Sequence, residues 1–504
     1  MRLRARTVAI TLFLAANSAA LSQPRDNHWD GAARRDEARA RDAQGVALAQ
    51  AGRIAEAVEQ FRAALQLAPD FPEAVYHLAL AYDRMGRTGE AMANAEDALR
   101  LSPDLIQARY VLAGCCGKRG DFEGELRLLA KITGRAPEFA EARYNYGLGL
   151  QREQRFAEAV EELRAAARLD PKNARYTLAL GVALANRNNN EAIRVLRTAV
   201  DLAPSDVEPR YNLALALAAA GQGTNALREF EAALQLNPNH AAARRGLGIA
   251  LMHEDKLEAS AEQLRRALKD APRDAETANN LGLVQLRLND LSGAIPSLER
   301  ATQLNPRLIK AHFNLAQAYQ RAGRSGDARL EAERAAELTA EQRGFGQAMV
   351  LTQSARQRLQ SGNPGDRPRA LSALHEAVAA SPEFADAHLE LGRAILATGG
   401  DTSEAVREFR RVLNLDPEQS EAHYQIGLAL LKSDEKTALE ELRAAADMAP
   451  CREEFMRALG RAALDAQDWS TAIAQFRHVL VWAPADKDSR AQLDRALAEQ
   501  KRNH

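Results

Sequence analysis

Residues 140–171 read AEARYNYGLGLQREQRFAEAVEELRAAARLDP. Two amphipathic helices of about a dozen residues each fit this stretch, with a polar turn at Gln154 to Phe156 between them. Pro171 ends the second helix, because proline lacks the N–H that a helix needs and disfavours the helical conformation of the residue before it. The stretch therefore predicts one helix–turn–helix unit.

The proline that ends this unit recurs along the chain at a nearly constant interval of 33 to 35 residues. The first series is Pro69, Pro103, Pro137, Pro171, Pro204, Pro238, Pro272 and Pro306, and after a gap Pro382, Pro417, Pro450 and Pro484 continue it. A fixed interval of this length indicates many copies of one small unit, each of which buries its apolar face only against its neighbours. We therefore expect an all-α array whose functional surface runs along the stack.

Small residues also recur in register with the prolines. The eighth position of each first helix is Gly or Ala: Gly45, Ala79, Ala113, Gly147, Gly181, Ala214, Gly248, Gly282, Ala316, Gly392, Gly427 and Gly460. The second helix also has small residues at fixed positions, such as Ala57, Ala91, Ala159 and Ala192, with Leu or Phe between them. Small side chains at these positions let the two helices of a unit approach closely.

This combination of small residues, intervening Leu or Phe and a closing proline resembles the tetratricopeptide repeat. The resemblance covers residues 38–484 in about thirteen units, and it implies an all-α solenoid of helix–turn–helix repeats that forms a superhelix. The fourth position, usually bulky in that family, is here mostly Arg or His, at Arg109, Arg143, Arg210, Arg244, His312 and His388. In the third unit Gly124 and Glu125 stand where alanine is expected, so we expect its second helix to pack loosely.

The repeat is interrupted once. One unit closes on Ala340 instead of a proline, and residues 361–368 are rich in Gly and Pro, which predicts a loop and a hinge or bulge. We therefore expect nine regular units at 38–340, a divergent unit at 341–384 with the loop insertion 361–368, three units at 385–484 and a capping helix at 485–504.

The N-terminus has the layout of a secretory signal peptide over residues 1–22. A basic segment at 1–6 precedes an apolar segment at 7–16 and a run of small residues at 18–22. An uncleaved anchor or a misassigned start codon would be the alternatives. We expect a polar linker at 23–37, and a mature chain in the periplasm or outside the cell without a membrane span.

The charge balance bears on the expected partners, and the cysteine content bears on disulfides. With 67 basic and 68 acidic residues, a nucleic-acid or anionic membrane surface is not the expected main partner. Three cysteines do not predict a disulfide framework. Cys115, Cys116 and Cys451 are interpreted as small buried residues, with a vicinal disulfide or a thiol sensor as the alternative.

The sequence contains no motif of catalysis or cofactor binding. HExxH, zinc-spaced Cys/His clusters, phosphate-binding glycine loops and the GxSxG elbow are all missing from the 504 residues. The array resembles the one attached to protein O-linked sugar transferases, but the residues after Pro484 are too few for a catalytic domain. We expect neither an enzyme nor a metal or other cofactor.

The resemblance implies that the first helix of each unit lines the concave face of the superhelix. Its fifth position is aromatic at Tyr76, Tyr110, Tyr144, Tyr211, Phe313 and Tyr424, and its sixth is Asn at Asn145, Asn212, Asn280 and Asn314. An amide donates and accepts hydrogen bonds together, so it can hold an extended backbone without reading its sequence. These residues are the predicted peptide-binding site, and packing against the next repeat is the alternative role.

These patterns favour an exported, non-enzymatic scaffold that binds extended peptides or partner proteins on its concave face. Two alternatives remain open. The chain could be an adaptor that presents substrates to a separately encoded envelope enzyme, or it could be a structural spacer. The sequence does not determine the oligomeric state or the partner.

Overall fold

The computed structural model describes residues 28–185 and 187–502, which fold into α-helices and one short 3-10 helix, with no strand among them. The α-helices are α1 (His28–Gln50), α2 (Ile54–Leu67), α3 (Pro72–Arg84), α4 (Thr88–Leu101), α5 (Ile106–Lys118), α6 (Phe122–Arg135), α7 (Ala140–Arg152), α8 (Phe156–Leu169), α9 (Ala174–Ala185), α10 (Asn189–Leu202), α11 (Val207–Ala219), α12 (Gly223–Leu236), α13 (Ala241–His253), α14 (Leu257–Asp270), α15 (Ala275–Arg287), α16 (Leu291–Leu304), α17 (Ile309–Arg321), α18 (Ser325–Gln360), α19 (Arg367–Ala380), α20 (Ala385–Ala397), α21 (Thr402–Leu415), α22 (Ser420–Leu430), α23 (Glu435–Met448), α24 (Glu453–Asp465), α25 (Trp469–Trp482) and α26 (Lys487–Arg502). The 3-10 helix η1 is Pro364–Asp366.

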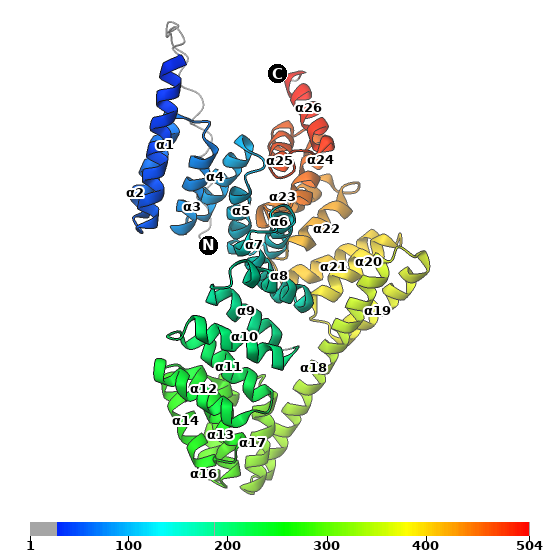
Figure 1. Cartoon of the computed structure of the whole chain (residues 1–504). Helices are drawn as coiled ribbons and strands as arrows, with labels where there is room; N and C mark the ends of the chain where they lie inside the picture. Colours follow the sequence, from blue (N-terminus) through cyan, green and yellow to red (C-terminus); the bar gives the residue numbers. More distant parts are fainter. Residues whose placement is uncertain (1–27, 186, 503–504) are drawn as a thin grey trace, which may run out of the picture.

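Consecutive helices pair as antiparallel hairpins that stack along the chain (Figure 1). The pairs run from α1 and α2 to α24 and α25, with α18 serving both as the second helix of one unit and the first helix of the next, and α26 covers the end. The predicted all-α solenoid is therefore confirmed.

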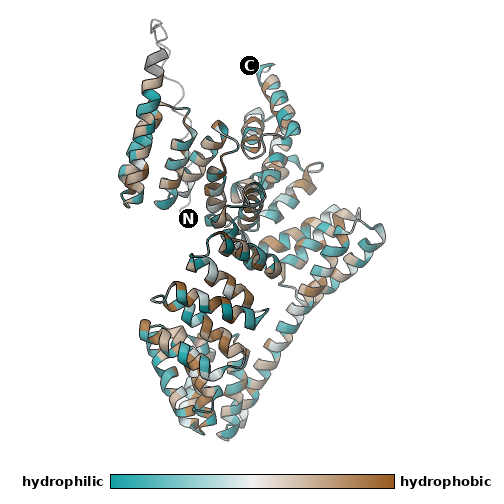
Figure 2. Cartoon of the chain, in the orientation of Figure 1, coloured by the Kyte–Doolittle hydropathy of each residue, from teal (hydrophilic) through white to brown (hydrophobic). Residues whose placement is uncertain are grey.

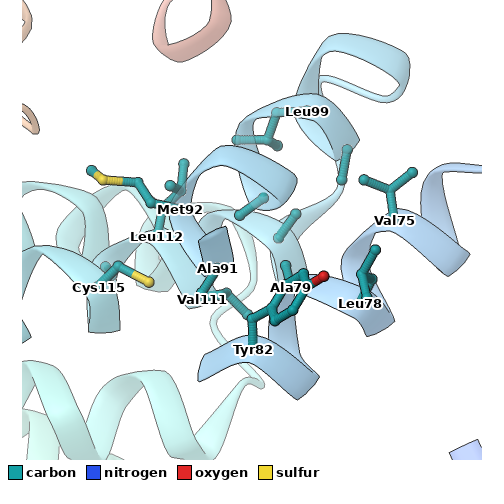
Figure 3. Packing of buried hydrophobic residues seen from close by; sticks show 14 of the residues in the cluster. Val75, Leu78, Ala79, Tyr82, Ala91, Met92, Leu99, Val111, Leu112 and Cys115 are labelled. Carbon is teal, nitrogen blue, oxygen red and sulfur yellow. The ribbon is translucent and has the colours of Figure 1, made fainter. Parts of the chain in front are cut away.

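The small residues at position eight are needed because the two helices of a unit nearly touch there. A Cβ on Gly147 would lie 2.6 Å from Cγ of Leu163, and one on Gly248 would lie 2.7 Å from Cγ of Leu264. Both leucines are fully buried. Apolar side chains of neighbouring units then fill the space between hairpins, as Leu78, Ala79 and Tyr82 do beside Ala91 and Val111 in Figure 3.

Hydropathy alternates around each helix rather than marking any helix as apolar throughout (Figure 2). This is the pattern of helices that bury one face in a repeat core. Among the described helices, none combines the length and the apolar character that crossing a membrane requires.

The polar residues at position four tie each unit together. Five of them place a nitrogen against the carbonyl oxygen of the proline six residues earlier: Arg109 on Pro103, Arg143 on Pro137, Arg244 on Pro238, His312 on Pro306 and His388 on Pro382. Several also reach a carboxylate on the second helix of their own unit, as Arg143 reaches Glu162 at 2.7 Å and His312 reaches Glu331 at 2.6 Å. A polar bridge from turn to second helix thus replaces the bulky residue of the usual repeat.

The interruption differs from its predicted form. No turn separates the units at Ala340, because α18 continues without a break through the expected boundary 340/341. A proline there would remove a helical hydrogen bond, and with alanine in its place nothing stops the helix. Figure 1 shows α18 as a long rod between the units ending at α17 and those starting at α19. The loop predicted at 361–368 is shorter, since η1 begins at Pro364 and α19 at Arg367.

The N-terminal prediction is changed in one respect. The polar linker predicted at 23–37 is helical from His28 onward, as the beginning of α1. The predicted signal peptide at 1–22 lies outside the described residues. At the other end, α26 packs Leu493, Ala496 and Leu497 against α25, as a capping helix does.

The two ends of the array meet. Helices α4, α5 and α6 contact residues 447–482, and we call this contact the seam. Val481 and Trp482 belong to the same apolar cluster as Leu99 and Leu112. In Figure 1 the orange and red helices α23 to α25 accordingly lie beside the blue and cyan helices α4 to α6.

The seam changes two expectations from the sequence. All three cysteines are buried, as expected, but Cys116 forms a disulfide with Cys451, which lies 335 residues further along the chain, and only Cys115 is a free thiol. The second helix of the third unit, α6, packs less extensively on its hairpin partner than any other second helix of the described chain, as expected, but it has the C-terminal units as an additional neighbour. A Cβ on Gly124 would lie 2.7 Å from that of Cys451, so the glycine provides the space for the C-terminal units to approach.

Candidate functional site

The aromatic residues at position five are mostly packed between repeats. The Tyr110 ring lies 5.0 Å from that of Phe139, the Tyr144 ring 5.0 Å from that of Tyr176, and the Tyr424 ring 4.5 Å from that of Phe455. Tyr211 contacts His240 in the same way, at 5.1 Å. In each case the partner lies at the start of the next unit, and these tyrosines are half-buried. Packing therefore occupies much of the surface that these rings could offer to a ligand.

The asparagines at position six do not form a free ladder of amides. Asn145 donates to the Tyr110 hydroxyl, and Asn314 donates to Oδ1 of Asn279 at 2.9 Å. Asn212 donates to the backbone oxygen of Glu208 in its own helix. Asn280 is partly exposed. Three of the four predicted amides therefore already have partners inside the repeat stack.

Tyr76 is the position-five residue that lines a hollow on the predicted face. The hollow has a volume of about 160 Å³ between the first two units. Leu80 and Arg84, at positions nine and thirteen of the same helix, line it together with Val46 and Ala49 of the preceding unit. Positions five, nine and thirteen thus share one face, as the helical period predicts.

Phe313 differs from the other position-five residues, because its side chain is 65% exposed. In the regular units the start of the next first helix covers this ring. After α17 that helix is missing from its usual place, because α18 continues straight instead of turning. The exposure of Phe313 is therefore a consequence of the interruption.

The same interruption leaves a groove of about 1180 Å³, which we call the interruption groove. Three consecutive inter-repeat segments line it: residues 307–310 before and in α17, 338–345 in the middle of α18, and 380–383 between α19 and α20, with Arg411 of α21 at its edge. Its apolar lining includes Leu308, Ile309, Leu338 and Phe345.

The rim of the interruption groove carries both signs of charge. Arg307 pairs with Glu341 across it at 2.7 Å, while Lys310, Glu383 and Arg411 are exposed. The ring of Phe345 packs edge-on against that of Phe384 at 5.0 Å, yet Phe345 remains 45% exposed. Lys310 precedes Phe313 by three residues on α17, so that ring extends the same surface by about one helical turn.

The interruption groove was not identified from the sequence. Two features of the sequence could have indicated it. Ala340 stands where every regular unit has a proline near its end, and an aromatic residue, Phe345, follows five residues later. Those residues predicted an irregularity, but a groove depends on how three turns lie in space.

The titratable groups of the described chain serve the repeat framework. Six histidines lie against carboxylates, namely His77, His240, His312, His388, His423 and His478. Burial raises the pKa of the Cys115 thiol to about 12 and raises the pKa of the Tyr110 hydroxyl. Within residues 28–185 and 187–502, no group of three or more His, Cys, Asp or Glu side chains is arranged to hold a metal ion.

Comparison with known families agrees with the repeat pattern. Models described as tetratricopeptide repeat match residues 72–105, 364–426 and overlapping windows from 117 to 343, and one described as TPR repeat matches residues 45–86. Together these matches span more than half of the 504 residues. A search of curated proteins finds no match.

Several solved structures are similar to parts or most of the chain. The APC/C hetero-tetramer Cut9-Hcn1 has 17% identity over 90% of this chain and 95% of that chain, with a TM-score of 0.35. MamA from Desulfovibrio magneticus has 27% identity over 33% of this chain and 94% of that chain, with a TM-score of 0.31. YrrB, described as a TPR protein with an unusual peptide-binding site, has 19% identity over 54% of this chain and 97% of that chain, with a TM-score of 0.25. At these TM-scores the similarities carry no argument about the site.

Proposed function

Because the chain belongs to the tetratricopeptide repeat family, we propose that it is an exported, non-enzymatic scaffold that binds an extended peptide or a segment of a partner protein. The binding site in this proposal is the interruption groove together with Phe313. The predicted stripe of position-five aromatics then has a lesser role, and the hollow at Tyr76 is its most open part.

One observation carries the choice of site. Large aromatic side chains near the interruption are exposed, Phe313 on α17 by 65% and Phe345 on α18 by 45%, and Phe345 lines the interruption groove. An exposed apolar surface with a polar rim marks an interaction site. The regular units instead pack the equivalent aromatic ring against the next unit.

The shape and chemistry of the interruption groove suit an extended peptide. Its volume of about 1180 Å³ exceeds that of most small-molecule pockets, and three consecutive inter-repeat segments line it. Phe345 and the half-buried Ile309 offer contacts to apolar side chains of a ligand, whereas Leu308 and Leu338 are buried. The exposed Lys310 and Arg411 would attract acidic groups of a ligand, and Glu383 would attract a basic one. A ligand with apolar residues flanked by charges of both signs fits this surface best.

A peptide-display selection tests the site. Peptides selected on the chain starting at Gln23 should bind Phe313→Ser and Phe345→Ser variants at least tenfold more weakly than the parent. Leu236→Ser is the matched control, because Leu236 is 41% exposed on α12, away from the interruption groove. Equal affinity of the parent and both groove variants for all selected peptides would contradict the proposal.

Export is the second part of the proposal. The basic, apolar and small-residue segments of residues 1–22 motivate it, and the Cys116–Cys451 disulfide supports it, since disulfides persist mainly in oxidising compartments. Cell fractionation followed by N-terminal sequencing tests it. We expect a chain that starts near residue 21 or 23 outside the cytoplasm, and an intact Met1 in the cytosolic fraction would contradict this.

A structural spacer remains the second candidate. The internal partners of Tyr110, Asn145 and Asn314 favour it for the regular units, where the concave residues contact one another. It does not account for the exposed apolar residues around α18.

A further inference from the structure

The seam joins parts of the chain that the repeat architecture does not bring together. In a solenoid each unit contacts only its neighbours. Within the described residues, α4 and α25 are the one pair of helices far apart in the sequence that share more than a few contacts, although they contact each other less than consecutive helices do. The units between α4 and α25 therefore form a closed circuit. Within the described residues, the seam is the contact that closes it.

Several non-covalent contacts in the seam are ion pairs at its edge. Lys131 pairs with Glu453 at 2.6 Å, His478 pairs with Glu96 at 2.6 Å, and Arg127 pairs with Glu454. The cationic partners are partly exposed, so water and salt weaken these pairs.

The buried part of the seam is small. Arg452 is 8% exposed and faces Glu123, Glu421 and Glu454, of which only Glu123 lies on the other side of the seam. Apart from Cys451 itself, two C-terminal apolar side chains, Val481 and Trp482, enter the cluster of α2 to α7. Arg109 also donates a buried hydrogen bond to the carbonyl oxygen of Trp482. These contacts are fewer than those between neighbouring units, each of which shares whole helix faces.

Closure also depends on every unit between the two sides of the seam. The orientation of α24 relative to α5 is the sum of small rotations along the intervening units. A slight relaxation in each unit therefore separates the two sides by a large distance unless something holds them. We propose that the Cys116–Cys451 disulfide is a redox latch, so that the array is closed when the bond is formed and opens at the seam when it is reduced.

The chemistry of the latch is thiol–disulfide exchange. On closing, two thiols lose two protons and two electrons to an oxidant of the disulfide class, which becomes a dithiol, and one S–S bond forms between Cys116 and Cys451. On opening, a dithiol reductant gives the electrons and protons back and is itself oxidised to a disulfide. Cys116 is fully buried and Cys451 is 4% exposed, so exchange requires that the seam first open transiently.

Cys115 does not compete for the latch. Although it is adjacent to Cys116, it is fully buried and close to Asp83. Burial raises the pKa of its thiol to about 12, so it remains protonated at neutral pH and is a poor attacking group in exchange. The pairing of Cys116 with Cys451 is thereby kept free of a neighbouring nucleophile.

The latch is tested by comparing oxidised and reduced forms of the chain starting at Gln23. Small-angle X-ray scattering should give a larger radius of gyration after reduction with a dithiol, and the original curve after reoxidation. Replacing the other two tryptophans, as Trp29→Phe and Trp469→Phe, leaves Trp482 as the single emitter. Trp482 is 3% exposed in the closed form, so its fluorescence emission should shift to the red on reduction. Circular dichroism should show the same helix content in both forms.

Variants separate the latch from a general effect of reductant. Cys451→Ser should behave as permanently open, and Cys115→Ser, the matched control, should close and open like the parent. If Cys451→Ser fails to fold, reversible reduction of the parent still gives the answer. Identical scattering and emission of the oxidised and reduced parent would overturn the latch. That outcome would leave the proposed peptide binding untouched, because the interruption groove lies outside the seam.

Discussion

At the scale of single residues, the departures from the usual repeat are the informative positions. Arg and His at position four depart from the bulky residue that the tetratricopeptide repeat usually has there. In the structure they bind the carbonyl oxygen of a closing proline and often a carboxylate on the second helix. These side chains hold the turn against its own unit, so their chemistry is structural rather than catalytic.

Arg143 tests this role. Arg143→Leu leaves the Pro137 oxygen and the Glu162 carboxylate without their partner in a partly buried place. Loss of such a pair costs about 1–3 kcal/mol of the free energy of unfolding, which urea unfolding would measure. Arg155→Ala is the control, because its pair with Glu158 is largely exposed and worth about 0–1 kcal/mol. Equal losses for the two variants would show that the bridge does not hold the turn.

The candidate site was only partly predictable at this scale. Periodicity placed Tyr76, Leu80 and Arg84 correctly on one face, which lines a hollow. Periodicity did not show that the rings of Tyr110, Tyr144 and Tyr424 would pack against the next unit. That packing depends on how consecutive units are offset from each other, which the period of a single helix does not determine. Phe313 was predicted to share their role, but its side chain is exposed. The cause lies 27 residues further on, at Ala340, where the missing proline lets α18 continue instead of turning back over the Phe313 ring.

At the scale of elements, α18 decides where the regular array is broken. The proline interval, the small residues and the helix ends predicted almost every hairpin. The missing proline at 340 showed that a turn was altered, but the sequence did not distinguish an irregular turn from a continuous helix. Gly344 is part of the outcome, because its missing side chain lets α18 approach the backbone oxygen of Ala380.

The segment after α18 is the expected first site of proteolysis. Residues 361–366 are exposed or nearly so and are held by short local hydrogen bonds around Ser361 and Asn363. A brief treatment with a nonspecific protease should cut there before any inter-repeat turn, because local opening is easiest where few buried contacts resist it. Under reducing conditions the products should separate into two folded helical fragments. Early cuts spread evenly over the inter-repeat turns would contradict this.

At the scale of the whole molecule, the seam converts a linear array into a closed circuit. Loop-closure entropy assigns a bond across 335 residues about 5–6 kcal/mol of stabilisation, far more than any single surface ion pair. No local pattern predicts this contact. Cys116 and Cys451 belong to distant units, and only the accumulated curvature of the stack brings them together.

The same geometry separates two surfaces with different roles. Tyr110, Tyr144 and Tyr211 of the regular units pack against the next unit, whereas Phe313 and Phe345 are exposed at the interruption, where Phe345 lines a large groove. The proposed binding site therefore lies at the break in the repeat and not along its regular concave face.

Hydrogen–deuterium exchange on the chain with and without a selected peptide tests this location most directly. We expect the peptide to slow exchange at residues 307–310, 338–345 and 380–383, with no change in the first helices of the regular units around Tyr144 and Tyr211. Slower exchange along those regular helices, with none at the three segments of the interruption groove, would contradict it.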